Sequence, residues 1–198
     1  MKISIVTPTY NSEYYIEETI ESIITQKGNF EIEYLIIDGG STDNTLKILD
    51  NYKNLLNSTK FHKKCKNITF DYISEPDNGM YDAIAKGFQK INGDVVAYLN
   101  SDDYYLPNAF QAIYLMFTHY KTLDWLTGVI TVYNKYGNIV KLNTPYFYSR
   151  TFIKKGIYGK YLPFIQQESC FWRKGLLDKI NLNKFASYKY AGDYYLWH

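Results

Sequence analysis

Cysteine, long apolar runs and an excess of one charge are all missing from this sequence. Only two of the 198 residues are cysteine, Cys65 and Cys170, and their spacing fits neither a metal site nor a disulfide framework, so a reducing cytosol is expected. No apolar run is long enough to cross a membrane or to act as a signal peptide. The 22 basic and 20 acidic residues nearly balance, for a net charge of +2, which argues against a nucleic-acid partner.

Signatures of two common enzyme classes are also absent. No Gly-x-Gly-x-x-Gly follows the first expected strand, which argues against a dinucleotide-binding fold, and no Gly-x-Ser-x-Gly elbow indicates a serine hydrolase. No internal repeat or Gly/Ser-rich linker divides the chain, so residues 1–198 are expected to form one domain. Tyrosine, in contrast, is abundant at 22 residues, which suits a wet, sugar-binding cleft and equally fits compositional bias.

Strand and helix patterns alternate through the first half of the chain. Apolar runs over residues 3–7, 31–38, 68–73 and from Val95 onward predict four buried strands. The first helix is expected to be capped by Asn11 or Ser12 and closed by Gly28, and the second to be capped by Ser41 or Thr42. This alternation predicts an α/β fold with a mostly parallel sheet and helices on both faces.

The pattern changes after Pro107. A helix is expected to bury a stripe that runs to Tyr120, and the strand patterns 125–133 and 139–142 predict a hairpin that adds an antiparallel edge to the sheet. A long aromatic loop over residues 144–164 and a helix over about 174–180 follow. A last helix starting near Asp193 has little more than one turn before His198, which predicts that the native protein continues.

Each of the four expected strands ends in polar residues. The carboxyl ends of parallel strands form the ligand crevice in such sheets, so these residues are expected to meet at one edge. The fourth strand ends at the adjacent carboxylates Asp102 and Asp103, which fit either a cation site or a capped turn. The residues alone leave both interpretations open.

Six segments, in order along the chain, form a recognisable set of motifs. They are Ser4-Ile5-Val6-Thr7-Pro8-Thr9-Tyr10-Asn11, Ile37-Asp38-Gly39-Gly40-Ser41-Thr42-Asp43-Asn44-Thr45, Glu75-Pro76-Asp77-Asn78-Gly79-Met80-Tyr81-Asp82-Ala83, Leu99-Asn100-Ser101-Asp102-Asp103, Gln167-Glu168-Ser169-Cys170-Phe171-Trp172-Arg173 and Gly192-Asp193-Tyr194. This set resembles family 2 glycosyltransferases of the GT-A fold, which use nucleotide-diphosphate sugars to build bacterial polysaccharides and lipopolysaccharides. The resemblance implies a Rossmann-like, mostly parallel central sheet with helices on both faces and a small antiparallel edge.

The resemblance implies a nucleotide site at the strand ends. The loop after the first strand packs against the nucleoside, and Asp38 accepts a hydrogen bond from the base; the alternative for Asp38 is a cap of the next helix. Asp77 and Asp82 lie near the nucleotide, although Asp77 also fits the start of a helix. The implied nucleotide-binding residues are Thr7, Pro8, Tyr10, Asp38, Asp77, Asn100 and Asp102.

The resemblance also implies a divalent cation, Mn²⁺ or Mg²⁺. Asp102 matches the last carboxylate of the family's Asp-x-Asp motif, which binds a cation that bridges the two donor phosphates. Asn100 stands where many members carry the first aspartate, so the sequence departs from the common motif there. Asp103 is the candidate for a second metal ligand.

Asp193 corresponds to the family's catalytic base, which takes the proton of the acceptor hydroxyl in a single inverting displacement. Glu168 is the competing candidate for this base. Trp172 and Arg173 fit contacts to the acceptor or donor sugar, and equally fit structural packing around the cleft.

The expected function is therefore a metal-dependent inverting transfer from a nucleotide sugar, with uridine diphosphate as the expected carrier. The acceptor is a saccharide or lipid-linked saccharide at the cytoplasmic membrane surface. Two alternatives stay open: a sugar nucleotidyltransferase, and a non-catalytic saccharide- or partner-binding module on the same fold. A nucleotidyltransferase would carry a basic, Gly-rich loop after the first strand, where this chain has Thr7-Pro8-Thr9-Tyr10-Asn11-Ser12.

Overall fold

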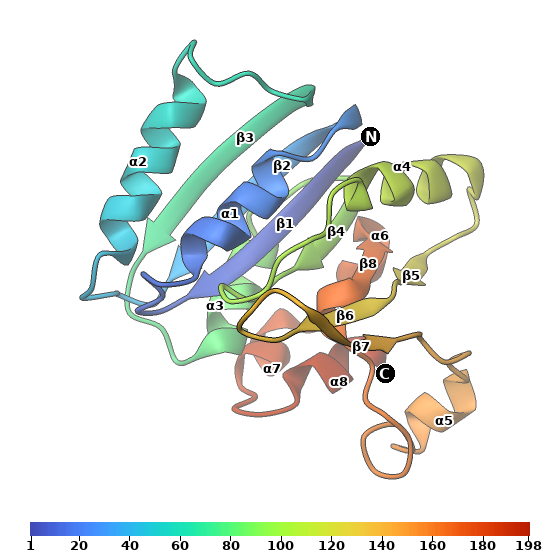
Figure 1. Ribbon diagram of the computed structural model, residues 1–198. Coiled ribbons are helices and arrows are strands. Elements are labelled where there is room, and N and C mark those ends of the chain that lie inside the picture. Colours follow the sequence, from blue (N-terminus) through green and yellow to red (C-terminus); the bar gives the residue numbers. More distant parts are fainter.

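The computed structural model describes residues 1–198 and is built around a six-stranded sheet with the order β3-β2-β1-β4-β8-β5 (Figure 1). Four strands are parallel: β1 (Lys2–Thr9), β2 (Gly28–Asp38), β3 (Cys65–Ser74) and β4 (Val95–Tyr98). At one edge β8 (Cys170–Arg173) pairs antiparallel with β4, and β5 (Trp125–Thr127) pairs antiparallel with β8. The predicted α/β fold with a mostly parallel sheet is confirmed.

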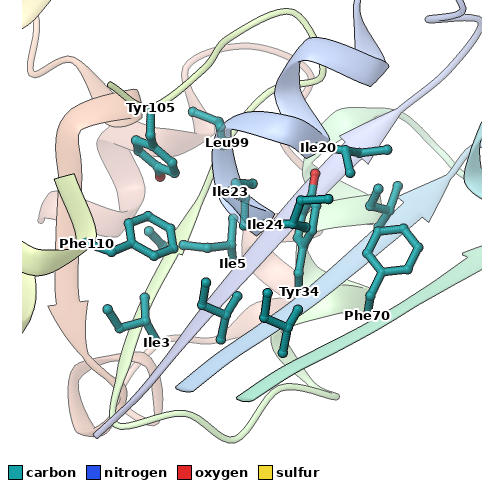
Figure 2. Packing of buried hydrophobic residues seen from close by; sticks show 14 of the residues in the cluster. Ile3, Ile5, Ile20, Ile23, Ile24, Tyr34, Phe70, Leu99, Tyr105 and Phe110 are labelled. Carbon is teal, nitrogen blue, oxygen red and sulfur yellow. The ribbon is translucent and has the colours of Figure 1, made fainter. Parts of the chain in front are cut away.

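Helices cover both faces of this sheet, as predicted. Helices α1 (Ile16–Ile24), α2 (Thr45–Asn57) and α4 (Ala109–His119) contribute to one core cluster, part of which is drawn in Figure 2. Helices α3 (Met80–Phe88), α6 (Lys174–Leu177), α7 (Leu182–Ala186) and α8 (Gly192–Trp197) contribute to the cluster on the opposite face. No helix is long and apolar enough to cross a membrane.

Helix α1 shows how the sequence pattern produces this packing. Its isoleucines at positions 16, 20, 23 and 24 follow the helical period and are all fully buried, while Glu17 and Glu18 occupy the first turn, where the helix dipole favours negative charge. Gly28 does not close this helix, contrary to the prediction. It begins β2 with φ +150°, and a Cβ there would lie 2.4 Å from the Phe30 ring, so the position requires glycine.

The predicted helix caps are also wrong. No side chain caps α1, which begins after Tyr15, and α2 begins after Asn44 rather than after Ser41 or Thr42. Asp43 Oδ1 instead accepts a hydrogen bond of 2.9 Å from the Thr45 backbone N–H. The expected cap residues are engaged in contacts between loops, which are described with the site below.

The second half of the chain departs furthest from expectation. Strands β6 (Ile130–Tyr133) and β7 (Ile139–Asn143) form the predicted hairpin, but they make a separate two-stranded sheet, and the antiparallel edge of the main sheet comes from β8 and β5. Tyr120 follows the end of α4 and is exposed, so it does not extend the buried stripe. A short helix, α5 (Arg150–Lys154), interrupts the expected loop, and α6 ends earlier than expected. A 3₁₀ turn over Gln167–Ser169 precedes β8.

Candidate active site

The polar strand ends meet at one edge of the sheet. Thr9, the last residue of β1, pairs with Asp38, the last residue of β2, and Asp38 pairs with Ser74 at the end of β3. On the other side of β1, Leu99 donates a backbone hydrogen bond of 2.9 Å to Val6, so the segment after β4 continues along the same edge. The strand ends that were predicted to meet therefore lie at one edge of the sheet.

Asp38 organises the loop between β2 and α2. Its side chain is fully buried, and its Oδ2 atom accepts hydrogen bonds from Gly40 N at 3.0 Å, Ser41 N at 2.9 Å and Ser74 Oγ at 2.7 Å. Its Oδ1 atom accepts one bond, from the Ser41 hydroxyl. Each carboxylate oxygen offers about two acceptor positions, and Oδ1 uses one of them, so one position on Oδ1 is open to a further donor.

The loops after β1 and β2 are tied together by side chains that were expected to cap helices. Asn11 has φ +48°, its N–H donates to Ser41 Oγ at 2.8 Å, and its Oδ1 accepts from Thr42 N at 2.8 Å. Glu13 Oε2 accepts from the Asn44 backbone N–H at 2.9 Å. These bonds join two segments that are about thirty residues apart and hold the edge of the crevice.

Of the three nucleoside-loop residues expected from the sequence, only Tyr10 presents its side chain to solvent, with 62 % of its surface exposed. Thr7 and Pro8 are buried, and Thr7 Oγ1 accepts a hydrogen bond of 3.1 Å from the Tyr34 hydroxyl. Tyr10 is thus the member of this set that offers a ring face to a base, whereas Thr7 and Pro8 shape the backbone beneath it.

The turn from Asn100 to Asp103 is fastened to α1. Thr19 Oγ1 lies 2.9 Å from the Ser101 carbonyl oxygen and 2.8 Å from the Asp103 carbonyl oxygen, and the Ser12 and Ser101 hydroxyls lie 2.8 Å apart. With the turn held in this way, the Asp102 side chain is exposed. Asn100 Oδ1 is buried and has no hydrogen-bond partner. One exposed carboxylate and one unsatisfied amide oxygen therefore flank the turn.

Carboxylates gather around this turn. Burial, with a further contribution from the nearby charges of Glu168 and Asp102, raises the pKa of Asp103 to about 6, and a hydrogen bond with the Asn100 side chain opposes this rise. Burial also raises the pKa of Glu168, with an additional contribution from the charge of Asp193. Asp102 and Asp103 after β4, Glu168 before β8 and Asp193 in α8 are thus near enough for the charge of one carboxylate to act on the next, and we call these four residues the acidic cluster.

The acidic cluster fits a divalent cation that shares its coordination with a ligand. No three His, Cys, Asp or Glu side chains are gathered as a complete metal site. Mg²⁺ and related hard cations are, however, commonly held by one or two carboxylates together with substrate phosphates. Asp102 and Asp103 offer such a pair, and the unpartnered Asn100 oxygen can accept from a metal-bound water. Burial is the main cause of the raised pKa of Asp103, and the repulsion from Glu168 and Asp102 that adds to it is what a cation would relieve.

Asp193 lies in the first turn of α8 and is almost completely buried. Burial raises the pKa of its carboxyl, and a hydrogen bond of 3.2 Å from the Tyr81 hydroxyl to Oδ1 opposes that rise. Gly192 packs against the Tyr81 ring so closely that a Cβ would lie 2.9 Å from ring atoms. Tyr81 on α3 therefore fixes both the position of α8 and the orientation of the Asp193 carboxylate.

Trp172 and Arg173 do not reach the site, and the packing alternative holds for both. Trp172 is 2 % exposed and contacts the Phe88 ring edge-to-face at 5.9 Å. Arg173 pairs with Val95 at the start of β4, the end opposite to Asp102, and its guanidinium donates to the carbonyl oxygen of Phe117 at 3.0 Å. The sequence pattern alone does not separate these roles, because the strand register decides which end of β8 faces the crevice.

Asp77 and Asp82 lie in the turn after β3 and at the start of α3. Asp77 Oδ1 accepts a hydrogen bond from Gly79 N at 2.8 Å, and Asp82 Oδ2 accepts from Asn78 N at 2.9 Å and forms an ion pair with Lys86 at 3.4 Å. Both carboxylates thus order this turn. Asp77 also lies against Gly39 of the neighbouring loop, where a Cβ would lie 2.8 Å from Asp77 Oδ2.

A cavity of about 510 Å³ adjoins the acidic cluster. Asp102, Asp103 and Glu168 line one part of its wall, and most of the rest is apolar. The apolar lining comes from the start of α4 and from the hairpin strand β6, including Ile130 and Val132. The site therefore combines three carboxylates with an adjoining apolar wall.

Sequence reasoning missed Thr19, Ser101 and Tyr81 as residues that hold the site. Ser101 and Tyr81 lie within the matching segments, and so their positions carried a signal that was not assigned a role. Thr19 carried none, since it belongs to the ordinary buried face of α1 and its contact to the turn is more than eighty residues away in sequence.

Comparison with known proteins identifies the family. The model of Glycosyl transferase family 2 matches residues 4–180. An uncharacterized glycosyltransferase of Mycoplasma pneumoniae, the MG025 homolog, is 33% identical over 120 residues, which is 59% of this chain and 36% of that protein. The poly(ribitol-phosphate) beta-N-acetylglucosaminyltransferase TarS of Staphylococcus aureus is 32% identical over 105 residues, which is 52% of this chain and 17% of TarS.

Solved structures share the fold. TarS residues 1–349 in complex with UDP superpose with a TM-score of 0.69 at 22% sequence identity, covering 100% of this chain and 54% of TarS 1–349. The mannosyltransferase PcManGT from Pyrobaculum calidifontis, in complex with GDP-Man and Mn²⁺, has a TM-score of 0.60 at 16% identity and covers 90% of this chain and 46% of its own. The chain thus spans about a third of the first curated relatives and about half of these structures.

Proposed function

Because this chain belongs to glycosyl transferase family 2, we propose that it transfers a sugar from a nucleotide-diphosphate donor to a hydroxyl group of a saccharide or lipid-linked saccharide. The observation that carries the proposal is the acidic cluster at the carboxyl edge, next to a loop that presents the Tyr10 ring. The proposed setting is cell-surface polymer synthesis at the cytoplasmic face of the membrane; the TarS relative, a poly(ribitol-phosphate) beta-N-acetylglucosaminyltransferase, supports the polymer synthesis.

Uridine diphosphate is the proposed carrier. TarS superposes in complex with UDP, and the free acceptor position on Asp38 Oδ1 suits a uracil N–H. Asp38 is fully buried, so a base can reach it only if the loop after β2 opens. The Tyr10 ring lies on the neighbouring loop and is exposed for stacking on the base.

The proposed cation is Mn²⁺ or Mg²⁺, held by Asp102 directly and by Asp103 as the second carboxylate. The Mn²⁺ in the PcManGT complex supports the use of a cation by this fold. When bound, the ion neutralises the charge that develops on the departing diphosphate. The chain's own contribution is a fixed turn: Thr19 donates to two backbone carbonyl groups of the turn and Ser12 bonds to the Ser101 hydroxyl, so the backbone that carries Asp102 is held in place.

Asp193 is the proposed base. An inverting transfer is one in-line displacement in which the acceptor oxygen bonds to the anomeric carbon, the diphosphate leaves from the opposite face, and the acceptor proton moves to a carboxylate. The pKa of Asp193 is raised by burial, which strengthens it as a proton acceptor, and the hydrogen bond from Tyr81 fixes its orientation. Glu168 also has a raised pKa and is the proposed residue only if Asp193 proves dispensable.

Two measurements test this proposal. Titration calorimetry with UDP is expected to show binding that strengthens when Mn²⁺ is added, and Asp102→Ala should abolish that enhancement while metal-free binding persists. Absence of UDP and GDP binding, with or without metal, contradicts the proposed donor site.

Turnover separates the two candidate bases. Asp193→Asn is expected to keep donor binding and to lower kcat by about 10² to 10⁴-fold, which is the usual contribution of a general base. Glu168→Gln is the matched control and should retain most of the activity. If Glu168→Gln loses activity and Asp193→Asn keeps it, Glu168 is the base. Nucleotide binding by the wild type without any sugar transfer would instead indicate a non-catalytic saccharide-binding module.

A further inference from the structure

One part of the chain differs sharply in charge from the rest. Residues 125–167, between Asp124 and Glu168, contain no acidic residue and six basic ones, so this segment has a formal charge of +6. The whole chain has a net charge of +2, so the remainder carries 2 − 6 = −4. All six basic side chains are exposed and none forms an ion pair. They are Lys135, Lys141, Arg150, Lys154, Lys155 and Lys160.

The same segment carries half of the chain's exposed large hydrophobic side chains. Ten of the twenty lie between residues 129 and 161, and Phe147 is 99% exposed. Ile139 and Val140 are neighbours on β7 and point to opposite faces of the hairpin, and both are more than half exposed. The ten are Val129, Val132, Tyr136, Ile139, Val140, Leu142, Tyr146, Phe147, Phe152 and Tyr161.

We call residues 129–161 the basic lobe. It consists of the β6–β7 hairpin, α5 and their connecting segments, and Figure 1 shows that these elements lie outside the six-stranded sheet. The hairpin is a separate sheet and contributes no strand to the main one. The exposed apolar side chains of the basic lobe therefore do not belong to the six-stranded sheet.

We propose that the basic lobe docks on an anionic phospholipid surface. Aliphatic and aromatic side chains gain from entering the boundary between headgroups and acyl chains, and lysines beside them can reach back to lipid phosphates. Each Lys or Arg near an anionic leaflet adds to the attraction, and the lobe contains no acidic residue that would oppose it. The positive charge of the lobe thus favours an anionic partner, and its exposed aliphatic side chains favour a lipid.

An anionic polymer is the competing partner and is less well matched. A polyanion would use the lysines and the aromatic faces, but it offers no apolar phase for Val129, Ile139, Val140 and Leu142. These side chains are the ones that a lipid interface explains and a polymer does not.

Docking would place the proposed active site against the membrane. The lobe residues Val129, Ile130 and Val132 line the cavity that also contains Asp102 and Asp103, so a bound lobe brings that cavity close to the lipid surface. This consequence rests on the proposed function, whereas docking itself does not and is measurable without any sugar transfer.

The test is co-sedimentation of the whole chain with vesicles. We expect binding to vesicles of equimolar phosphatidylcholine and phosphatidylglycerol, little binding to pure phosphatidylcholine, and a loss of binding in about 0.5 M NaCl, where exposed charges are screened. Failure to bind the anionic vesicles at low salt overturns the proposal.

Two sets of variants assign the binding to the lobe. The triple change Lys141→Glu, Lys154→Glu and Lys155→Glu is expected to weaken binding by about tenfold or more. The matched control changes three exposed lysines outside the lobe, Lys47→Glu, Lys64→Glu and Lys90→Glu, with the same net charge change, and should stay within about twofold of the wild type. Equal losses in the two triples overturn the assignment.

Leu142→Ser separates binding to lipid from binding to an anionic polymer, because Leu142 is one of the aliphatic side chains for which a polymer offers no apolar phase. The side chain is 61% exposed, and far-UV circular dichroism checks that the fold stays intact. The substitution should weaken vesicle binding by several-fold while leaving retention on a dextran sulfate column unchanged. Strong retention on dextran sulfate combined with no vesicle binding assigns the lobe to an anionic polymer and overturns the proposal.

Discussion

Asp38 gives the sharpest test of how the site is held together, because the sequence predicts a ligand contact for it, whereas the structure shows that it holds a loop. The resemblance predicts a contact to the nucleotide base, whereas the structure shows four hydrogen bonds to the carboxylate from Gly40, Ser41 and Ser74. The substitution Asp38→Asn keeps the shape and removes the charge. If Asp38 holds the loop, this change destabilises the protein even when no nucleotide is present.

The expected magnitude follows from the bonds. An amide can place its oxygen at the Oδ2 position, where it keeps three donors, and its nitrogen toward the Ser41 hydroxyl, which then accepts. Since charge-assisted bonds are roughly twice as strong as neutral ones, three weakened bonds cost about 3 kcal/mol in the free energy of unfolding. Asp38→Ala leaves four donors without a partner and should cost about 4 kcal/mol or more.

Urea unfolding followed by tryptophan fluorescence measures these differences. Asp77→Asn is the matched control, because Asp77 is also a predicted nucleotide residue but accepts only one bond, from Gly79, and is partly exposed. The free energy of unfolding of the Asp77→Asn variant should fall by less than about 1 kcal/mol. The reasoning is refuted if Asp38→Asn unfolds within about 0.5 kcal/mol of the wild type, which is the spread of ordinary surface substitutions, and yet no longer binds UDP.

Three further outcomes are expected. Gly87→Ala places a Cβ 2.4 Å from Val6 Cγ1 on a buried face of α3, so overpacking should lower the free energy of unfolding by about 1–3 kcal/mol in urea titrations, and a stability equal to that of the wild type would contradict the packing. Thr19→Val removes the hydroxyl that joins α1 to the turn carrying Asp102, so Mn²⁺-dependent UDP binding should weaken by several-fold in calorimetry while metal-free binding stays constant; a uniform loss would instead indicate global damage. The Asp103 carboxyl has a pKa of about 6 in the folded protein against 3.8 for the isolated group, so its contribution to stability is present below about pH 4 and is lost as the pH rises to 6. Asp103→Asn should therefore stabilise the metal-free protein at pH 7 by about 1–2 kcal/mol, after allowance for solvent screening. The free energy of unfolding of this variant should also depend less on pH between pH 4 and 6. An unchanged pH profile would show that the pKa of this carboxyl is not raised in the folded protein.

Local patterns were sufficient to predict the first half of the fold, and the family resemblance added the members of the acidic cluster. Apolar runs and the isoleucine stripe of α1 predict β1 to β4 and their helices, since burial of a periodic face is decided by neighbours in sequence. Parallel strands share a direction, so Asp38 and Asp102 at their carboxyl ends had to meet at one edge.

Contacts between distant residues decided the rest. Whether Ser41 caps a helix or bonds to Asn11, and whether Trp172 faces a sugar or Phe88, depends on loop–loop contacts and on strand register, which no local pattern contains. The hairpin shows the same limit, because its turn is local but its separation from the main sheet depends on β8 occupying the place beside β4. The sequence by itself determined which groups could do chemistry, and the tertiary structure decided which of them face the crevice, because orientation is set by packing across the chain.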